Sequence, residues 1–224
     1  MRLLALDTST EYCSVALRLD ETVLSRHVLA GQGHSGMVLA MVDELLAEGG
    51  VGLAELDGVA FGSGPGSFTG LRIACGVAQG LAFGTDLPVA GISTLLALAE
   101  GSGADKAVAC LDARMGEVYH GIYRRCGGAW EELSPPGLYA PADLPLPEGG
   151  GWTGCGNGFA QYGEALRGRH GDALAAVQEE LYPRAEFIAR LAAPVFAHGR
   201  GVAPEEVLPV YIRDKVALKT CERI

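Results

Sequence analysis

Three observations predict an α/β fold. Short apolar runs typical of buried strands alternate along the chain with stretches whose apolar residues recur every three or four positions, as in helices. A strand pair opens the chain over 3–19 and another opens its second half over 107–123, which indicates a faint internal duplication. The glycines of 101–103 are the best candidate for a hinge. The length of 224 residues fits either one large domain or two small lobes.

The first part of the chain predicts a three-stranded meander followed by a helix. Leu3–Asp7 is a short apolar strand, Cys13–Leu19 alternates as a half-buried strand does, and Val23–Leu29 returns after a turn. A helix is then predicted over Gly36–Glu48, with Ser35 as its N-cap. Its apolar stripe is broader than one core face needs, so this helix is either deeply buried or offers a surface to a partner.

The stretch Gly58–Phe83 is the centre of the sequence pattern. A buried strand leads through a glycine-rich loop into a helix, for which Ser67 or Thr69 is the expected N-cap. Gly84 is expected to end this helix in the left-handed conformation. A strand, a glycine loop and a helix N-terminus in succession form a cradle suited to an anion. The alternative is a tight turn that lets strand and helix pack closely, because the loop matches neither a Walker A nor a dinucleotide motif.

The second half repeats this alternation of strands and helices. Strands are predicted over 88–92, 107–111 and 117–123, a second strand-to-glycine turn over 152–158, and helices over 95–99, 159–166 and 183–196. Either Ser93 or Thr94 caps the first of these helices. Proline and glycine are frequent from Ser134 to Gly151, which indicates a loop excursion. Pro209–Arg213 is a last extended piece.

The composition excludes several classes of protein. With 49% apolar and 20% charged residues, the chain has enough apolar surface for a real core, and no apolar run reaches the length of a membrane span. Its net charge of −10 makes it a poor nucleic-acid binder alone, because such binding neutralises phosphates with Lys and Arg. The one basic concentration is the tail, with Arg213, Lys215, Lys219 and Arg223, and it reads as a solubilising terminus or as a nucleic-acid contact.

The residues that carry chemistry are few. Six cysteines lack metal-binding or disulfide spacing, a reduced pattern that predicts a cytoplasmic protein. A nucleophile elbow, a spaced histidine pair and a Walker A loop are all missing, so we predict no catalytic residue and no metal ligand. Asp7, at a strand end before two hydroxyls, faces a phosphate or a metal in one interpretation. In the other it closes the hairpin through an Asx turn.

Four blocks of the sequence resemble one family in order and spacing. They are Leu4–Thr10 (LALDTST), Gly64–Arg72 (GPGSFTGLR), Asp112–Tyr119 (DARMGEVY) and Pro209–Arg213 (PVYIR). They are similar to those of the TsaB family, also called YeaZ, across nearly the whole chain. The resemblance implies the two-lobed fold of actin, Hsp70 and sugar kinases (ASKHA), with mixed sheets flanked by helices. It also implies an N-terminal lobe of residues 1–103 and a C-terminal lobe of residues 104–224, whose tail packs back on the first.

The same resemblance implies a role in making threonylcarbamoyladenosine (t6A) at position 37 of tRNAs that read ANN codons. In that family TsaB is the non-catalytic partner of its paralogue TsaD, and the ATPase TsaE binds the pair. TsaD holds its metal with a histidine pair, whereas the corresponding stretch here, Ile92–Leu98, offers apolar side chains that cannot replace such ligands. ATP and the metal then belong to the partners, tRNA is contacted only through the complex, and no membrane is involved.

The resemblance also implies a partner contact on two helices, about Ser35–Glu48 and Phe68–Phe83. Small residues on the second helix let another helix approach closely, and the same face would support a homodimer when TsaD is absent. The predicted contact residues are Met37, Val38, Met41, Leu45, Phe68, Leu71, Arg72, Cys75, Gly76, Gln79 and Gly80.

Nucleotide binding by the chain alone is expected to be weak or absent. The implied fold would bring phosphates near Asp7, Thr8, Ser9 and Asp112, but the first loop lacks the glycine that ATP-using relatives generally have there. Two other functions stay open at this point. One is a small ATP-dependent kinase or phosphotransferase of the same superfamily. The other is a glycoprotease-like peptidase, for which the sequence lacks a metal pair or an activated nucleophile.

Overall fold

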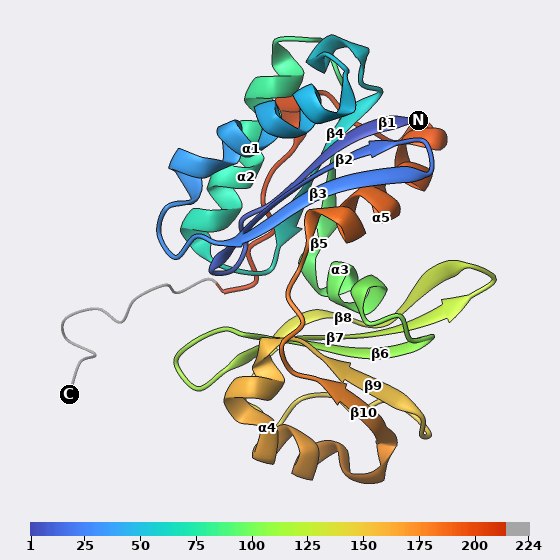
Figure 1. Cartoon of the computed structure of the whole chain (residues 1–224). Coiled ribbons are helices and arrows are strands. Elements are labelled where there is room, and N and C mark those ends of the chain that lie inside the picture. Colours follow the sequence, from blue (N-terminus) through green and yellow to red (C-terminus); the bar gives the residue numbers. More distant parts are fainter. Residues whose placement is uncertain (214–224) are drawn as a thin grey trace.

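A computed structural model describes residues 1–213 as two five-stranded sheets with helices on their faces (Figure 1). In each sheet a three-stranded antiparallel meander is extended by two strands that run parallel to its first strand. This shared topology confirms the predicted internal duplication. The first sheet, in the order β3-β2-β1-β4-β5, comprises β1 (Arg2–Asp7), β2 (Tyr12–Leu19), β3 (Thr22–Leu29), β4 (Gly58–Gly64) and β5 (Val89–Ser93). The second, in the order β8-β7-β6-β9-β10, comprises β6 (Lys106–Asp112), β7 (Val118–Cys126), β8 (Ala129–Tyr139), β9 (Trp152–Cys155) and β10 (Leu174–Gln178).

The helices of residues 1–213 form three layers around these sheets. They are α1 (His34–Gly49), α2 (Phe68–Phe83), α3 (Thr94–Gly101), α4 (Asn157–His170) and α5 (Ala185–Ala197). Helices α1 and α2 lie on the outer face of the first sheet, and α4 lies on the outer face of the second (Figure 1). Helices α3 and α5 lie between the two sheets and contact each other there.

The central strand β1 explains why the first lobe has two separate cores. Leu4 and Leu6 point into the cluster under α1 and α2, whereas Leu3 and Ala5 point into the cluster under α5. Each of the four side chains is fully buried, because β1 lies between β2 and β4 in the middle of the sheet. A strand buried on both faces has a continuous apolar run, which made this one visible in the sequence.

Helix α5 follows the second sheet in the chain but packs on the first. It contacts β1, β2 and β4, and its first amide, that of Ala185, donates to the Ser14 hydroxyl of β2 at 3.0 Å. Beyond α5, Val202 forms an antiparallel bridge with Val89 of β5. The boundary between residues 103 and 104 stays a prediction, and α5 with the segment after it joins the first lobe in space.

Two predicted caps are wrong. Gly84 ends α2 with φ −71° and ψ −10°, so it is right-handed, and its amide still bonds back into the helix. Helix α1 begins at His34 instead of Gly36, with Gly33 at the N-cap position and no side-chain cap, so Ser35 lies inside the helix. His34 itself is buried. The helix therefore begins at a buried residue, two positions before the start that the local cap signal predicted.

The loop predicted over Ser134–Gly151 is wrong in its first part. Residues 134–139 belong to β8, which is the edge strand of the second sheet. It tolerates Pro135 and Pro136 because both fall at a register shift, between the pairs His120–Gly137 and Ile122–Ser134. Strand β10, the opposite edge, was not predicted. It is short and largely exposed, so its sequence lacks the burial pattern that marks central strands.

The remaining sequence predictions concern cysteines, membranes and the basic tail. Cys75 and Cys110 are buried free thiols and pack as small residues in two of the hydrophobic clusters. No helix in the part of the chain that the structure describes is long and apolar enough to cross a bilayer. Of the basic tail only Arg213 is described, since Lys215, Lys219 and Arg223 lie outside the described residues.

Candidate functional site

The glycine loop after β4 packs directly on the turn between β1 and β2. The Thr8 hydroxyl donates to the Gly70 carbonyl at 2.6 Å, and the Ser67 amide donates to the Ser9 carbonyl at 2.7 Å. A Cβ atom on Gly70 would lie 1.8 Å from the Thr8 carbonyl oxygen, and one on Gly66 would lie 2.6 Å from that of Ser9. Two backbone segments therefore need these glycines in order to touch, which favours the tight turn over the anion cradle.

Helix α2 begins at the end of this loop, and its N-cap prediction is confirmed. The hydroxyl oxygen of Ser67 accepts a hydrogen bond from the Gly70 amide at 3.3 Å. That contact satisfies one of the amides that a helix N-terminus leaves free. The Ser67 hydroxyl oxygen therefore serves as the cap of its own helix.

Asp7 closes the hairpin turn in the way the Asx interpretation predicts. Its Oδ1 atom accepts from the Ser9 amide at 3.0 Å and from the Ser9 hydroxyl at 2.8 Å. Its Oδ2 atom has no partner among the described residues, and a Cβ atom on Gly62 would lie 2.0 Å from it. Burial raises the pKa of the Asp7 carboxyl to about 7, against the smaller opposing effect of the two Ser9 hydrogen bonds.

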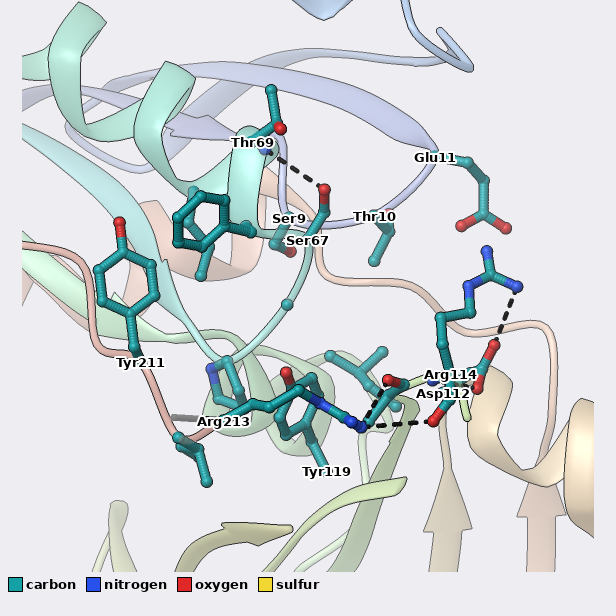
Figure 2. A pocket seen from close by; sticks show the side chains of 18 of the residues that line it. Ser9, Thr10, Glu11, Ser67, Thr69, Asp112, Arg114, Tyr119, Tyr211 and Arg213 are labelled. Atoms are coloured by element: carbon teal, nitrogen blue, oxygen red, sulfur yellow. Dashed lines mark hydrogen bonds and ion pairs between the residues drawn. The ribbon is translucent and has the colours of Figure 1, made fainter. Parts of the chain in front are cut away.

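A cavity of about 770 Å³ separates the two lobes. Figure 2 shows Ser9 and Glu11 facing it from the first lobe and Asp112 and Arg114 from the second, while Arg213 reaches in from the end of the described chain. Of the four residues predicted to contact a nucleotide, Ser9 and Asp112 line this cavity. The other two, Asp7 and Thr8, are fully buried beneath it.

Asp112 is already engaged by its neighbours. Its Oδ1 atom accepts from the Arg114 amide at 2.8 Å and from the Tyr162 hydroxyl at 3.2 Å, and its Oδ2 atom lies 3.1 Å from the Arg114 guanidinium. The Asp112 amide donates to the Asn157 side-chain oxygen at 3.0 Å. The second hairpin is therefore held by Arg114 of the hairpin itself and by Asn157 and Tyr162 of α4.

Residues 204–213 form a segment that we call the C-terminal strap, and it lies along α2. The Gln79 side-chain amide donates to the carbonyls of Pro204 and Val207, at 3.1 Å each. The Cys75 thiol lies 3.8 Å from the same Val207 carbonyl. One long side of α2 is therefore covered by the strap, and Gln79 serves this contact within the chain.

The strap then crosses from the first lobe to the second. The Val210 amide donates to the Ser63 carbonyl of β4 at 2.7 Å. Three residues later the Arg213 guanidinium donates to the Ala113 carbonyl at 2.9 Å and pairs with Glu117 at 2.8 Å, both in the second hairpin. The sequence could not reveal these contacts, because their partners are about a hundred or more positions apart.

The two helices predicted to meet a partner have clearly different buried and exposed sides. Five of the predicted contact residues are buried in the first lobe and are therefore not available to a partner: Val38, Met41, Leu45, Leu71 and Cys75. Met37 is half-buried, whereas Phe68, Arg72, Gly76 and Gly80 are exposed. A Cβ atom on either glycine would meet open space.

The stretch Ile92–Leu98 is structural. The Ser93 hydroxyl accepts from the Leu96 amide at 3.4 Å and caps α3, as one of the two alternatives predicted. The Thr94 hydroxyl donates to the Pro65 carbonyl, and Leu95 and Leu98 are fully buried against the second sheet. Within residues 1–213 no group of three or more His, Cys, Asp or Glu side chains is arranged to hold a metal ion.

Two histidines that are distant in sequence meet inside the second lobe. His120 of β7 is fully buried, and its ring centroid lies 6.2 Å from that of His170 at the end of α4. Neither nitrogen of His120 has a partner among the described residues. Burial, with a smaller effect of His170, lowers the pKa of His120 to about 3, so the ring is neutral. Sequence spacing gave no signal for this pair.

The comparisons with known proteins agree with this architecture. A family model described as TsaD, tRNA N6-adenosine threonylcarbamoyltransferase, matches residues 22–155. The chain is 40% identical to an Escherichia coli protein named tRNA threonylcarbamoyladenosine biosynthesis protein TsaB, over 98% of this chain and 97% of that one. The chain belongs to the TsaB family. A TsaB of Haemophilus influenzae is 36% identical over 98% of this chain and 96% of its own length.

A solved structure of a TsaB-family protein confirms the fold. YeaZ from Pseudomonas aeruginosa matches with a TM-score of 0.87 and 42% identity, covering 94% of this chain and 99% of that one. The predicted two-lobed ASKHA-type α/β fold is therefore confirmed for this member of the TsaB family.

The geometry of the cavity predicts that the chain alone does not bind ATP with micromolar affinity. The Thr8 hydroxyl and the Ser67 cap are used within the chain, and Asp112 is held by Arg114. We expect titration calorimetry with ATP and magnesium to give a dissociation constant of about a millimolar or weaker, in the range of marginal complexes. A micromolar constant that Arg114→Gln removes would contradict this expectation.

Proposed function

We propose that this chain is a non-catalytic accessory subunit in the formation of t6A at position 37 of tRNAs that read ANN codons. It forms a heterodimer with TsaD, and the pair recruits TsaE. ATP and the metal ion are held by those partners, and tRNA is contacted through the complex in the cytoplasm. The names of the relatives support the pathway, because the E. coli and H. influenzae proteins are called threonylcarbamoyladenosine biosynthesis proteins.

The observation that carries the accessory role is the environment of Ile92–Leu98. The resemblance aligns this stretch with the metal-binding histidines of TsaD, and here Leu95 and Leu98 are fully buried core residues. No nitrogen or oxygen ligand could replace them without opening the core of the second lobe. The transfer of the threonylcarbamoyl group to adenosine is therefore assigned to the partner.

The exposed side of α2 supports a helix-packing interface. Gly76 and Gly80 face open space. No neighbouring atom within residues 1–213 lies close enough to require a glycine at either position. Each glycine in an exposed helix interior costs about 1 kcal/mol relative to alanine. Contact with a second helix at close range would offset that cost, and two copies of the chain would pair through the same stripe when TsaD is absent.

The experiment is t6A formation in a reconstituted system of TsaD, TsaE, the threonylcarbamoyl donor and tRNA, with this chain present or omitted. We expect modification to fall to background when it is omitted and no modification by this chain alone. Modification by the chain without companions would overturn the proposal.

A matched pair of variants tests the interface. Gly80→Leu places a large side chain on the stripe and is expected to abolish TsaD binding in a pull-down, while the melting temperature stays at or above that of the parent chain. Gly80→Ala, which adds one methyl group, should bind nearly as the parent does. Sedimentation of both variants without TsaD reports self-pairing, which the leucine should also prevent. Unchanged TsaD binding by Gly80→Leu would refute the interface.

The kinase alternative is less well supported by the same geometry. A phosphotransferase of this superfamily needs free groups on both hairpins to face a nucleotide. Both hairpins face the cavity, but the Thr8 hydroxyl of the first is bonded to the Gly70 carbonyl, and the Asp112 carboxylate of the second is engaged by Arg114 and Tyr162. ATP hydrolysis by the purified chain alone would favour the alternative.

A further inference from the structure

The exposed stripe of α2 contains one arginine, Arg72, whose side chain is held in place by its neighbours. Phe68, Arg72, Gly76, Gly80 and Phe83 are exposed and recur every three or four residues, so they form one line along the outside of the helix. The glycines occupy its middle. Arg72 lies one turn before them, next to the strap, and it is the only charged residue in the sequence of α2.

The Arg72 guanidinium is held in place by two aromatic rings. Its central carbon lies 3.7 Å from the centroid of the Phe68 ring and 5.6 Å from that of Tyr211, and the two rings lie 5.3 Å apart. Its Nε atom donates to the Tyr211 hydroxyl at 2.9 Å. A guanidinium fixed in this way loses little further freedom when it binds a partner.

The end of the guanidinium remains available. The structure of residues 1–213 gives its two terminal nitrogens no carboxylate and no carbonyl partner, and the side chain is exposed. These nitrogens form the planar fork that matches a carboxylate with two parallel hydrogen bonds. Arginine, tyrosine and other aromatic residues are also the side chains that most often dominate protein interfaces.

The charge around Arg72 also indicates an anionic partner. The chain carries 27 Asp and Glu residues and a net charge of −10, yet neither α2 nor residues 207–213 of the strap contain one. The two acids of the strap, Glu205 and Glu206, lie at its other end, next to the Pro204 carbonyl that Gln79 contacts. The strap adds exposed apolar side chains beside the arginine, with Leu208 72% and Tyr211 43% exposed. This surface, formed by Phe68, Arg72, Leu208 and Tyr211, is called the Arg72 patch below.

We propose that the Arg72 patch receives an Asp or Glu side chain of the same TsaD partner that packs on the glycine stripe, with an apolar residue of that partner on Leu208. This inference rests on the proposed function and adds the register of the contact, because the partner's carboxylate must lie one helical turn from the residues that cover Gly76. A protein carboxylate fits better than an RNA phosphate. RNA surfaces need several free cations, whereas the cation in the described part of the strap, Arg213, is paired with Glu117, and Leu208 is aliphatic.

The test measures TsaD binding by Arg72→Gln, Arg72→Lys and Arg72→Glu in the full chain. We expect Arg72→Gln to raise the dissociation constant for TsaD by about 30-fold or more, because one member of an interfacial ion pair is lost. The dependence of that constant on salt concentration should also become weaker. Lysine, which keeps the charge but loses the fork, should be intermediate. Arg190→Gln is the matched control, because Arg190 also lies over a phenylalanine on a helix, but on α5 at the opposite face of the first sheet. It should bind as the parent does.

The outcomes separate this inference from the proposed function. Loss of binding with Gly80→Leu but not with Arg72→Gln would overturn the inference and leave the proposed function standing. Unchanged TsaD binding by both variants would overturn the inference together with the proposed α2 interface, and the accessory role would then be decided by the t6A reconstitution alone. Rescue of Arg72→Glu by one acidic-to-basic substitution in TsaD would support the inference. If Arg72→Gln instead weakens binding of labelled tRNA to the chain at low salt and leaves TsaD binding unchanged, a phosphate is the occupant and the inference fails. Melting temperatures within a few degrees of the parent exclude misfolding as the cause.

Discussion

Gly70→Ala is expected to destabilise the chain by about 3 kcal/mol, at the upper end of the range for overpacking a close contact. The added Cβ atom would lie 1.8 Å from the Thr8 carbonyl oxygen, which is backbone and cannot move aside as a flexible side chain would. The glycine loop and the β1–β2 turn would have to separate. That movement would also break the hydrogen bond from the Thr8 hydroxyl to the Gly70 carbonyl, which is buried.

The control for this prediction lies on the same helix. Gly80→Ala meets nothing within 4 Å and is expected to stabilise the chain by up to about 1 kcal/mol, because alanine favours the helix. Urea unfolding of both variants at one pH gives the two free energies of unfolding. Equal and small changes for Gly70→Ala and Gly80→Ala would show that the loop does not depend on close backbone contact.

This pair of glycines shows where sequence reasoning succeeds and where it stops. The bounds of α2 and its Ser67 cap were predictable, because the apolar period and the cap lie within one segment. The role of each glycine was not, since the partner of Gly70 lies 62 positions away in the chain. The same holds for Arg72, whose contact with Tyr211 spans 139 positions.

The candidate site follows the same rule. Resemblance and periodicity pointed to two helices, but only packing separates Leu71 and Cys75, which are buried, from Gly76 and Gly80, which face open space. The sequence predicted the end of the strap only as an extended segment. Its contacts with both lobes depend on how the lobes are placed in the folded chain, which no local pattern encodes. Edge strands such as β10 were not predicted for another reason. Their positions are largely exposed, so the sequence lacks the apolar pattern that marks a buried strand.

The second large effect concerns acid stability and depends on His120. Its pKa is lowered from 6.5 to about 3 by burial, chiefly, and by His170. Between these values the unfolded chain binds a proton that the folded chain excludes. His120 therefore does not lower the free energy of unfolding above pH 6.5. As the pH falls from 6.5 toward 3, it lowers this free energy by about 1.4 kcal/mol per pH unit. His170, whose pKa burial also lowers, acts in the same direction.

Asp7 has the opposite dependence. Its pKa rises from 3.8 to about 7 in the folded chain, so its contribution is complete below pH 3.8 and is lost as the pH rises through 7. From pH 3.8 to 6.5 the effects of Asp7 and His120 oppose each other. The parent chain should therefore show a flatter stability profile over this interval than either group alone would give.

Removing His120 should expose the slope of Asp7. As the pH falls from 6.5 to 4.5, the free energy of unfolding of His120→Leu is expected to rise by roughly 3 kcal/mol relative to that of the parent chain. The reason is that protonation of the imidazole in the unfolded chain no longer opposes folding. The control is Ile122→Val, two residues along β7 in the same core, which should lower stability by about 1 kcal/mol equally at every pH. Urea unfolding from pH 4.5 to 8 separates the two variants. Parallel profiles for His120→Leu and the parent would mean that His120 takes up a proton in the folded chain as readily as in the unfolded chain, and the neutral pair between β7 and α4 would have to be abandoned.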